Sequence, residues 1–199
     1  MSTGYLAEQI EDTFGNGSQW DADIQYAREP ESLGTAGAVK FAASLLKKNS
    51  DFMIVNGDSF TELDMNGFIR FHRQHGGIVS MAVCWVPDAA RYGTVQFDGE
   101  KRITRFSEKT GKQEPGSINA GVYIFRREVL DRIPQGPSSL EKDLFPQLLG
   151  QGMCAFEAPG IFIDIGTPED YARAQMLYEK LRQAAVAEPQ LESSKLSNS

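Results

Sequence analysis

Apolar positions along the chain follow two periods, one typical of helices and one typical of strands. Apolar residues that recur every three to four positions predict helices over residues 5–14, 35–46, 65–75, 140–149 and 168–185. Shorter alternating or continuous apolar runs predict strands over residues 23–27, 52–55, 78–86, 93–97, 102–108 and 118–125, and near Cys154 and Ile161. The run at 52–55 is continuously apolar, which is typical of a strand buried on both faces.

The order of these elements predicts the fold class. Strands and helices alternate through the first half of the chain, which favours an α/β fold with a mostly parallel sheet and helices on both faces. Residues 93–125 form successive predicted strands joined by turns such as Asp98-Gly99, and they indicate a small antiparallel or mixed extension of that sheet. We expect one domain over residues 1–186 and a disordered polar tail over 187–199.

Composition narrows the choice of partners. The chain has 199 residues, 41% of them hydrophobic, which is enough to bury a core without disulfides or a structural metal. A net charge of -7 argues against nucleic acid as a partner, because binding a phosphate backbone requires a basic surface. This net charge is compatible with binding a phosphorylated small molecule through local cations or a metal ion.

No apolar run approaches the ~18 residues of a membrane span, so we expect no membrane partner. Cys84 and Cys154 lie in apolar segments, and we expect free buried thiols in a reducing, cytoplasmic compartment.

Two acidic residues follow short apolar strands. Asp58 ends Asn56-Gly57-Asp58, directly after the strand at 52–55, and Asp164 lies between a strand and a helix whose cap is Thr167. Ligands bind at the carboxyl edge of open α/β sheets, and Mg²⁺ prefers carboxylate oxygens shared with substrate phosphates. Each acid alone could equally cap a loop or a helix. Two acids at equivalent positions favour a metal held between phosphates.

Two further motifs contain groups that bind phosphates and sugars. Gly34-Thr35-Ala36-Gly37-Ala38 opens a predicted helix, where small residues let a ligand approach and free N–H groups point outward, although a plain helix start is the alternative. Glu108-Lys109 and Asn119 lie at strand ends and could bind sugar hydroxyls and a phosphate. A surface ion pair and a turn asparagine are the alternatives. His72 and His75 lie on one predicted helix and are expected to be solvated.

Taken in order, these motifs resemble the sugar-phosphate nucleotidyltransferase family, in particular its D-glycero-D-manno-heptose 1-phosphate guanylyltransferases and related mannose-1-phosphate guanylyltransferases. The resemblance runs from Gly4 to about Leu177. Eight segments carry it, which are Gly4-Tyr5-Leu6 with Ile10, and residues 33–38, 56–58, 91–95, 106–109, 118–123, 140–143 and 164–171.

The resemblance implies a Rossmann-like enzyme of nucleotide-sugar and cell-surface polysaccharide biosynthesis. Such an enzyme joins a nucleoside triphosphate, GTP in particular, to a heptose- or mannose-type sugar 1-phosphate and releases pyrophosphate. It implies Mg²⁺ held by Asp58 and Asp164, a nucleotide lined by Gly34, Thr35 and Gly37, and a sugar phosphate held by Gly93, Glu108, Lys109 and Asn119. Lys109 would contact the phosphate of the sugar, and with Asp58 and Asp164 it completes the expected catalytic set.

One part of the family pattern has no counterpart. Family members begin with a strand, a Gly-rich loop and a downstream lysine that cradle the triphosphate, and nothing before Gly4 supplies these groups. We therefore expect an N-terminally truncated chain, in which Met1 is an internal methionine of a longer protein and transferase activity is weak or absent. Loss of the central first strand would leave unpaired sheet edges, which favour homo-oligomers. A non-catalytic sugar-nucleotide-binding or regulatory module, or an assembly partner without a ligand, is the alternative.

Overall fold

The structure, a computed structural model, describes residues 1–48, 50–107 and 111–187, with side chains described up to residue 179. Of the predicted tail over 187–199, only residue 187 is therefore described. The motif Glu108-Lys109 lies wholly outside the described residues. The α-helices are α1 (Ala7–Phe14), α2 (Gly34–Ala42), α3 (Met65–His75), α4 (Phe145–Leu148) and α5 (Pro168–Ala187), and a π-helical turn, η4, spans Leu140–Leu144. The strands are β1 (Ser2–Thr3), β2 (Ala27–Arg28), β3 (Phe52–Val55), β4 (Ser59–Thr61), β5 (Val79–Val86), β6 (Thr94–Phe97), β7 (Ile103–Ser107), β8 (Gly116–Phe125), β9 (Met153–Glu157) and β10 (Phe162–Asp164).

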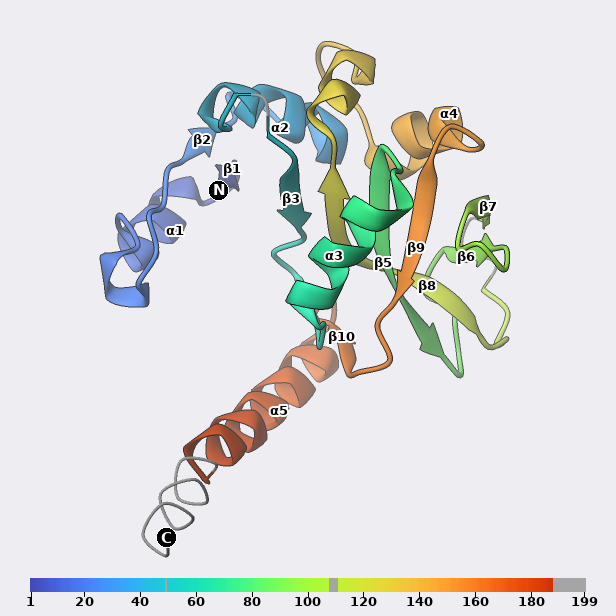
Figure 1. Ribbon diagram of the computed structural model, residues 1–199. Coiled ribbons are helices and arrows are strands. Elements are labelled where there is room, and N and C mark those ends of the chain that lie inside the picture. The colour runs from blue at the N-terminus through green and yellow to red at the C-terminus, as the bar shows by residue number, and fades with distance from the viewer. Residues whose placement is uncertain (49, 108–110, 188–199) are drawn as a thin grey trace, which may run out of the picture.

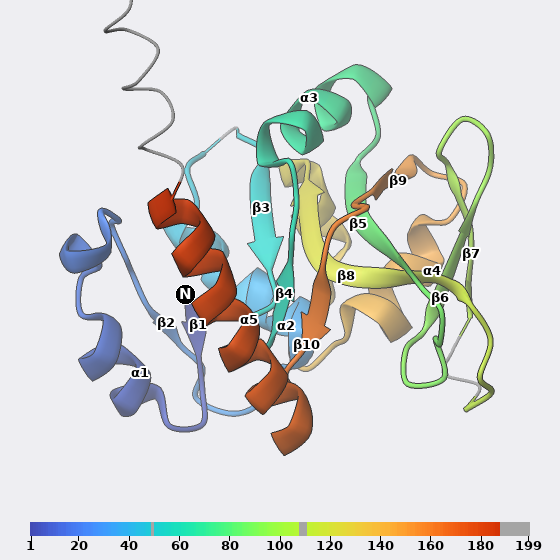
Figure 2. The same ribbon diagram turned by 90° about the horizontal axis from the view of Figure 1, so that it is seen from below.

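The strands form one large sheet and two small ones (Figures 1 and 2). The large sheet has the order β7-β6-β8-β5-β9, and β3 also pairs with β8. β1 and β2 form a separate parallel pair, and β4 and β10 form an antiparallel pair. The predicted α/β architecture is present, but the expectation of mostly parallel pairing is wrong. β8 lies between β3 and β5 and runs antiparallel to both, so β5–β9 is the one parallel pairing of the large sheet within the described residues.

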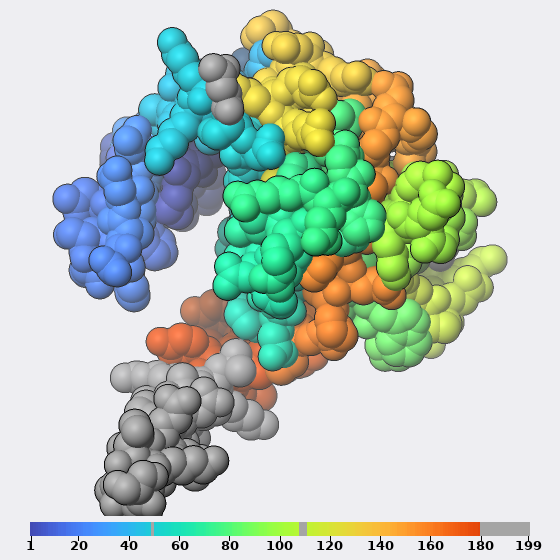
Figure 3. Space-filling view, viewed as in Figure 1, coloured from blue at the N-terminus to red at the C-terminus, as the bar shows by residue number. Residues whose placement is uncertain are grey.

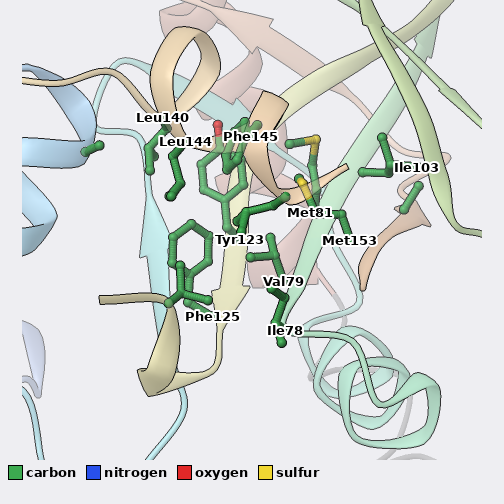
Figure 4. Packing of buried hydrophobic residues seen from close by; sticks show 14 of the residues in the cluster. Ile78, Val79, Met81, Ile103, Tyr123, Phe125, Leu140, Leu144, Phe145 and Met153 are labelled. Carbon is green, nitrogen blue, oxygen red and sulfur yellow. The ribbon is translucent and has the colours of Figure 1, made fainter. Parts of the chain in front are cut away.

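Two hydrophobic clusters cover the two faces of the large sheet. Along β5, Val79 and Met81 point into one cluster and Ala82 and Cys84 into the other, as the two-residue period of a strand requires. Fully buried Phe145 belongs to the first cluster, where its ring packs against Phe106 of β7 and, as Figure 4 shows, lies near Tyr123 and Phe125 of β8. This packing anchors β8 in the core, and β8 carries Asn119, one of the predicted site residues.

The first segment, β1-α1-β2, stands apart from the large sheet (Figure 1). The predicted strand at 23–27 is wrong over most of its length, because β1 offers only two residues to pair and β2 is correspondingly short. β3 is formed as predicted, but it is not buried on both faces. It pairs with β8 along one edge, and Val55 remains 58% exposed.

Helix ends and small buried groups follow local chemistry. α3 begins where the Asp64 side chain accepts the Gly67 N–H, and Thr167 Oγ1 accepts the Asp170 N–H at the start of α5, as its cap predicts. Both cysteines are free and buried as expected. The prediction for His72 is wrong, because its ring is buried with Nδ1 2.8 Å from Ser80 Oγ. No described helix is both long enough and apolar enough to cross a membrane.

Candidate functional site

The two predicted acidic residues lie on neighbouring strand ends. Asp164, the last residue of β10, pairs with Ser59, which directly follows Asp58. The backbone N–H of Ile165 donates to the Asp58 carbonyl at 2.9 Å, and the Asp164 carboxylate accepts the Gly166 N–H at 2.8 Å. The structure thus brings Asp58 and Asp164 together from positions 106 residues apart, through an antiparallel pair of short strands.

The loop that carries Asp58 packs directly against β8. The Asn56 N–H donates to the Gly121 carbonyl at 2.8 Å, and Thr61 Oγ1 donates to the Ala120 carbonyl at 3.0 Å. Gly121 has a φ of 73°, and a Cβ atom at this position would lie 2.9 Å from Ser59 Oγ and 3.0 Å from Asn56 Cγ. A glycine is therefore required for this close approach, because any side chain would strain the backbone and crowd the loop.

Asn119 has a side chain whose orientation is fixed by three hydrogen bonds. Its Nδ2 donates to the Tyr123 hydroxyl at 2.7 Å and to Glu141 Oε1 at 2.8 Å, and its Oδ1 accepts the Gly121 N–H at 3.1 Å. Asn119 is two residues from Gly121, so the predicted sugar-binding residue lies beside the loop that carries Asp58. This arrangement joins the motif at 56–58 to the motif at 118–123.

Tyr123 and Glu141 belong to this cluster, although neither was predicted as a site residue. Burial raises the pKa of the Tyr123 phenol, the hydrogen bond from Asn119 lowers it, and the nearby carboxylates of Glu141 and Asp58 raise it further. Tyr123 therefore stays protonated at neutral pH. Glu141 is exposed and lies in one of the segments that carry the family resemblance, but its place in the sequence gives no sign that it meets Asn119.

The predicted sugar-phosphate residues approach one another through the ladder of β6, β7 and β8. Thr94 pairs with Ser107 on β7 and with Ile118 on β8. Gly93 precedes Thr94 and Asn119 follows Ile118, so both lie next to this paired position. A Cβ atom on Gly93 would lie 3.1 Å from the Ser107 carbonyl, which leaves little room for a side chain. Glu108 and Lys109 follow Ser107 in the sequence but are outside the described residues.

The predicted nucleotide loop is only partly open. Gly34 and Thr35 are exposed, whereas Gly37 is buried and a Cβ atom there would lie 2.6 Å from the Gly136 carbonyl. The expectation of free N–H groups is wrong for Ala36 and Gly37, since both donate to the Ser138 carbonyl, at 2.9 and 3.2 Å. Gly37 thus serves close packing of α2 against the loop at 136–138, and Gly34 and Thr35 remain accessible.

Thr35 is connected to the sugar side of the cluster through η4. Its Oγ1 accepts the Leu140 N–H at 2.8 Å, and the next residue, Glu141, accepts from Asn119. The accessible part of the predicted nucleotide loop and the predicted sugar-binding asparagine therefore share one supporting turn.

Arg91 connects the loop before β6 to the start of α5. Its Nη1 donates to Asp170 Oδ2 at 2.6 Å, and this contact raises the pKa of the guanidinium, with a smaller contribution from Asp164. Asp170 also binds Arg173 and the Thr167 hydroxyl. These contacts fix the helix that follows Asp164.

The donor set suits a hard divalent cation that is shared with a ligand. No group of three or more His, Cys, Asp or Glu side chains suitable for a metal occurs in the described part of the chain. Asp58 and Asp164 lie next to each other along the backbone, and both carry the carboxylate oxygens that Mg²⁺ prefers in proteins.

The comparison with protein families decides the assignment. The family described as nucleotidyl transferase matches residues 1–181. The chain belongs to the nucleotidyl transferase family. This confirms the family predicted from the sequence motifs.

Curated relatives resemble this nucleotidyl transferase chain in sequence. It is 37% identical over 177 residues to the mannose-1-phosphate guanylyltransferase of Mycobacterium tuberculosis, covering 87% of the chain and 49% of the relative. It is 38% identical over 158 residues to the mannose-1-phosphate guanylyltransferase catalytic subunit beta of Xenopus tropicalis, covering 78% of the chain and 44% of the relative. The chain thus spans about half the length of the curated relatives that it matches.

A solved structure has the same fold. HddC from Yersinia pseudotuberculosis superposes with a TM-score of 0.79 at 32% identity, covering 89% of this chain and 76% of that chain. HddC complexed with GMP-PN superposes with a TM-score of 0.77. The α/β nucleotidyltransferase fold expected for the sequence is confirmed by this likeness.

Proposed function

We propose that the chain carries a site for nucleotidyl transfer from a nucleoside triphosphate, GTP in particular, to a sugar 1-phosphate of the mannose or heptose type. The products are a nucleotide-sugar and pyrophosphate. The observation that carries the proposal is the pairing of Asp164 with Ser59, which brings Asp58 and Asp164 to one place next to Asn119. The names of the guanylyltransferase relatives and the GMP-PN complex of HddC support guanine as the base.

In the proposed reaction an oxygen of the sugar phosphate forms a bond to the α-phosphorus of the triphosphate. The bond from the α-phosphorus to the oxygen bridging toward the β-phosphate breaks, and pyrophosphate leaves with the electron pair. Such a transfer needs little covalent chemistry from the protein and depends on positioning and on neutralising charge.

The chain's own groups have separate tasks in this proposal. Asp58 and Asp164 hold Mg²⁺, which when bound neutralises phosphate charge. Asn119 presents its fixed amide to sugar hydroxyls, and Glu141 holds that amide in place through its 2.8 Å hydrogen bond. Gly34 and Thr35 line the nucleotide, and Gly93, Glu108 and Lys109 complete the sugar-phosphate side, with Lys109 on the phosphate.

The experiment that tests the proposal measures GDP-mannose binding by calorimetry, in Mg²⁺ and in EDTA. We expect Mg²⁺ to strengthen binding to the wild-type chain but not to Asp58→Asn or Asp164→Asn. Asp64→Asn is the matched control, since Asp64 is an exposed acid that caps α3 away from the site. Equal strengthening of GDP-mannose binding by Mg²⁺ in all four proteins would overturn the proposed metal role.

Pyrophosphate release separates a transferase from a module that only binds. GTP, UTP, CTP and dTTP are compared with mannose 1-phosphate and heptose 1-phosphate as acceptors. GTP-dependent release that the two aspartate variants lack supports the transferase. Binding of nucleotide-sugar without any release of pyrophosphate supports the alternative, a sugar-nucleotide-binding module.

We further propose a cytoplasmic location, which the two buried free thiols support.

A further inference from the structure

The helix α5 meets the rest of the molecule mainly at its start. It projects from the body of the molecule directly after β10 (Figures 1 and 3), and β10 is the described element that it contacts most. The first turn of α5 therefore determines how this helix joins the strand that ends in Asp164. A side chain that binds this turn from another part of the chain also holds Asp164 in place.

Asp170, in the first turn of α5, is the buried partner of an ion pair between distant segments. Arg91 Nη1 donates to Asp170 Oδ2 at 2.6 Å, and only 8% of the Asp170 side chain is exposed. The two residues are 79 positions apart in the sequence, and Arg91 belongs to the loop that leads into β6. Hydrogen bonds between ionised groups are stronger than neutral ones. This ion pair therefore ties the loop before β6 to α5.

A second contact joins the same loop to β10. The ring of Tyr92 meets the ring of Phe162 edge-on, with 5.6 Å between the ring centroids, and Phe162 is the first residue of β10. Both rings pack against the buried cluster that contains Phe68 of α3. Arg91 and Tyr92 are consecutive residues, so the loop is held to α5 by one side chain and to β10 by the next.

These two contacts lie between two parts of the proposed site. Gly93, which is proposed for the sugar phosphate, directly follows Tyr92, and Asp164, which is proposed for the metal, ends β10. The hydrogen bond to Asp170 raises the pKa of the Arg91 guanidinium, and the Asp164 carboxylate adds a smaller contribution in the same direction. The guanidinium therefore lies within electrostatic reach of the proposed metal ligand while it is bonded to Asp170.

We propose that Arg91 is a positioning residue, which through Asp170 holds the proposed metal ligand Asp164 at a fixed place relative to the sugar-phosphate loop at Gly93. The inference rests on the proposed function, because it concerns the relation between two parts of that site. Loss of the ion pair leaves both parts present but lets them move relative to each other. Mg²⁺ and nucleotide-sugar then strengthen each other's binding less, because such coupling requires both ligands to favour one arrangement of the chain.

Arg173 offers a matched comparison. Its Nη1 donates to the other oxygen of the same carboxylate, Asp170 Oδ1, at 2.9 Å, but from within α5, three residues further along the helix. Both arginine side chains are largely exposed, so neither substitution leaves a cavity in the core. Arg91→Gln and Arg173→Gln each remove one guanidinium from Asp170, and only Arg91→Gln releases the loop before β6 from α5.

The first measurement is amide hydrogen exchange, which needs no ligand. The Ile165 N–H donates to the Asp58 carbonyl and the Gly166 N–H to the Asp164 carboxylate, so these two amides report how the two acids are arranged. We expect both amides to exchange faster in Arg91→Gln than in the wild type, because local opening becomes easier when the first turn of α5 loses its partner.

The control variants separate positioning from a general loss of stability. Exchange at Ile165 and Gly166 should stay at the wild-type rate in Arg173→Gln, and Arg91→Lys should restore part of the protection because it keeps a cation opposite Asp170. Thermal unfolding checks that each variant is folded. Wild-type exchange rates in Arg91→Gln, or equal acceleration in Arg173→Gln, would overturn the inference.

The second measurement is GDP-mannose binding by calorimetry, in Mg²⁺ and in EDTA. Coupling between two ligands is typically worth about 5–150-fold in affinity. We expect the strengthening by Mg²⁺ to be about fivefold or more smaller in Arg91→Gln than in the wild type, with little change in EDTA. Arg173→Gln should behave as the wild type. A merely structural role would weaken binding in both solutions alike, and either that result or full strengthening in Arg91→Gln contradicts the inference.

A double-mutant cycle tests whether Arg91 acts through Asp170. In an Asp170→Asn background, Arg91→Gln should cause no further acceleration of exchange and no further loss of the Mg²⁺ effect, because its partner is already changed. A further loss as large as that in the wild-type background would mean that Arg91 acts on another group, and the inference would be wrong.

Failure of the proposed function gives a different result. If Mg²⁺ does not strengthen GDP-mannose binding in the wild type, the metal role of Asp58 and Asp164 is overturned. The exchange rates of Ile165 and Gly166 then decide by themselves whether Arg91 positions Asp164.

Discussion

The two sides of β3 meet the rest of the chain in opposite ways. Toward β8, the strand is paired along its whole length and lies against fully buried Phe125. Toward β1, no strand of the described part of the chain pairs with its edge, and Val55 is largely exposed. The proposed metal- and sugar-binding residues lie on the paired side, where β8 holds Asn119 beside the loop with Asp58, whereas Gly34 and Thr35 lie on the open side. The difference teaches that Asp58, Asn119 and Asp164 are positioned by hydrogen bonds and strand pairing on the β8 side of β3.

The largest effect is expected from Phe145→Ala, which removes the ring at the centre of the cluster that holds β8. The ring is fully buried and packs on Phe106, Tyr123 and Phe125. Its loss should reduce the free energy of unfolding by about 3–5 kcal/mol. Urea denaturation measures this value, and a loss as small as that of an exposed residue would mean that the paired side is not the rigid part.

A smaller effect is expected from Gly121→Ala, which tests the contact between β8 and the loop at 56–58. The positive φ and the close approach of Ser59 and Asn56 should cost about 1–3 kcal/mol of stability. Gly57→Ala is the matched control, because a Cβ atom there meets nothing within 4 Å. If urea denaturation gives the same free energy of unfolding for both variants, the packing of the loop against β8 does not require a glycine at position 121.

The Asp170 contacts should produce a pH-dependent effect. The hydrogen bond from Arg91, and then that from Thr167, hold the pKa of the Asp170 carboxyl below its usual range. A depressed pKa in the folded state adds stability above the unfolded pKa of about 3.9, and this contribution is lost as the pH falls through the folded pKa. Chemical denaturation from pH 7 to pH 3 should therefore show Asp170→Asn less stable than wild type at pH 7, with the gap shrinking below about pH 4. A gap that stays constant with pH would rule out the charged form as its cause.

The smallest effect is expected on the open side. Val55→Thr keeps the shape of a β-branched residue at a position that is already exposed, so the stability should change by about 0.5 kcal/mol or less. The same substitution at buried Val79 should cost clearly more, because a hydroxyl would enter the core without a partner. Similar losses at the two positions, measured by urea unfolding, would erase the contrast between the two sides.

The local sequence pattern predicted where helices and strands lie along the chain better than it predicted which strands pair with one another. β3 and α3 have their predicted bounds, because a continuous apolar run ends at Asn-Gly-Asp and because Asp64 and Gly76 define the helix ends. The antiparallel course of β8 between two parallel strands has no local signal. The meeting of Asp58 and Asp164 was predicted from strand ends at one sheet edge, but it arises through β4, a strand that the pattern did not predict.

Contacts between distant segments account for what the sequence missed at the site. Glu141 reaches Asn119 across 22 residues, and the Ser138 carbonyl occupies the N–H groups of Ala36 and Gly37 from a hundred residues away. Neither contact changes the periodicity of its own segment. The chemistry of a residue can thus be predicted from its type and position, but its partner depends on how the chain folds back.

The π-helical turn at Leu140–Leu144 touches two parts of the chain with two consecutive residues. Leu140 binds the Thr35 hydroxyl, and Glu141 binds the Asn119 amide. A shift of this turn by less than the width of an atom would move both contacts at once. A displacement at Thr35 would therefore also displace the hydrogen-bond partner of Asn119, because one turn of backbone supports both side chains.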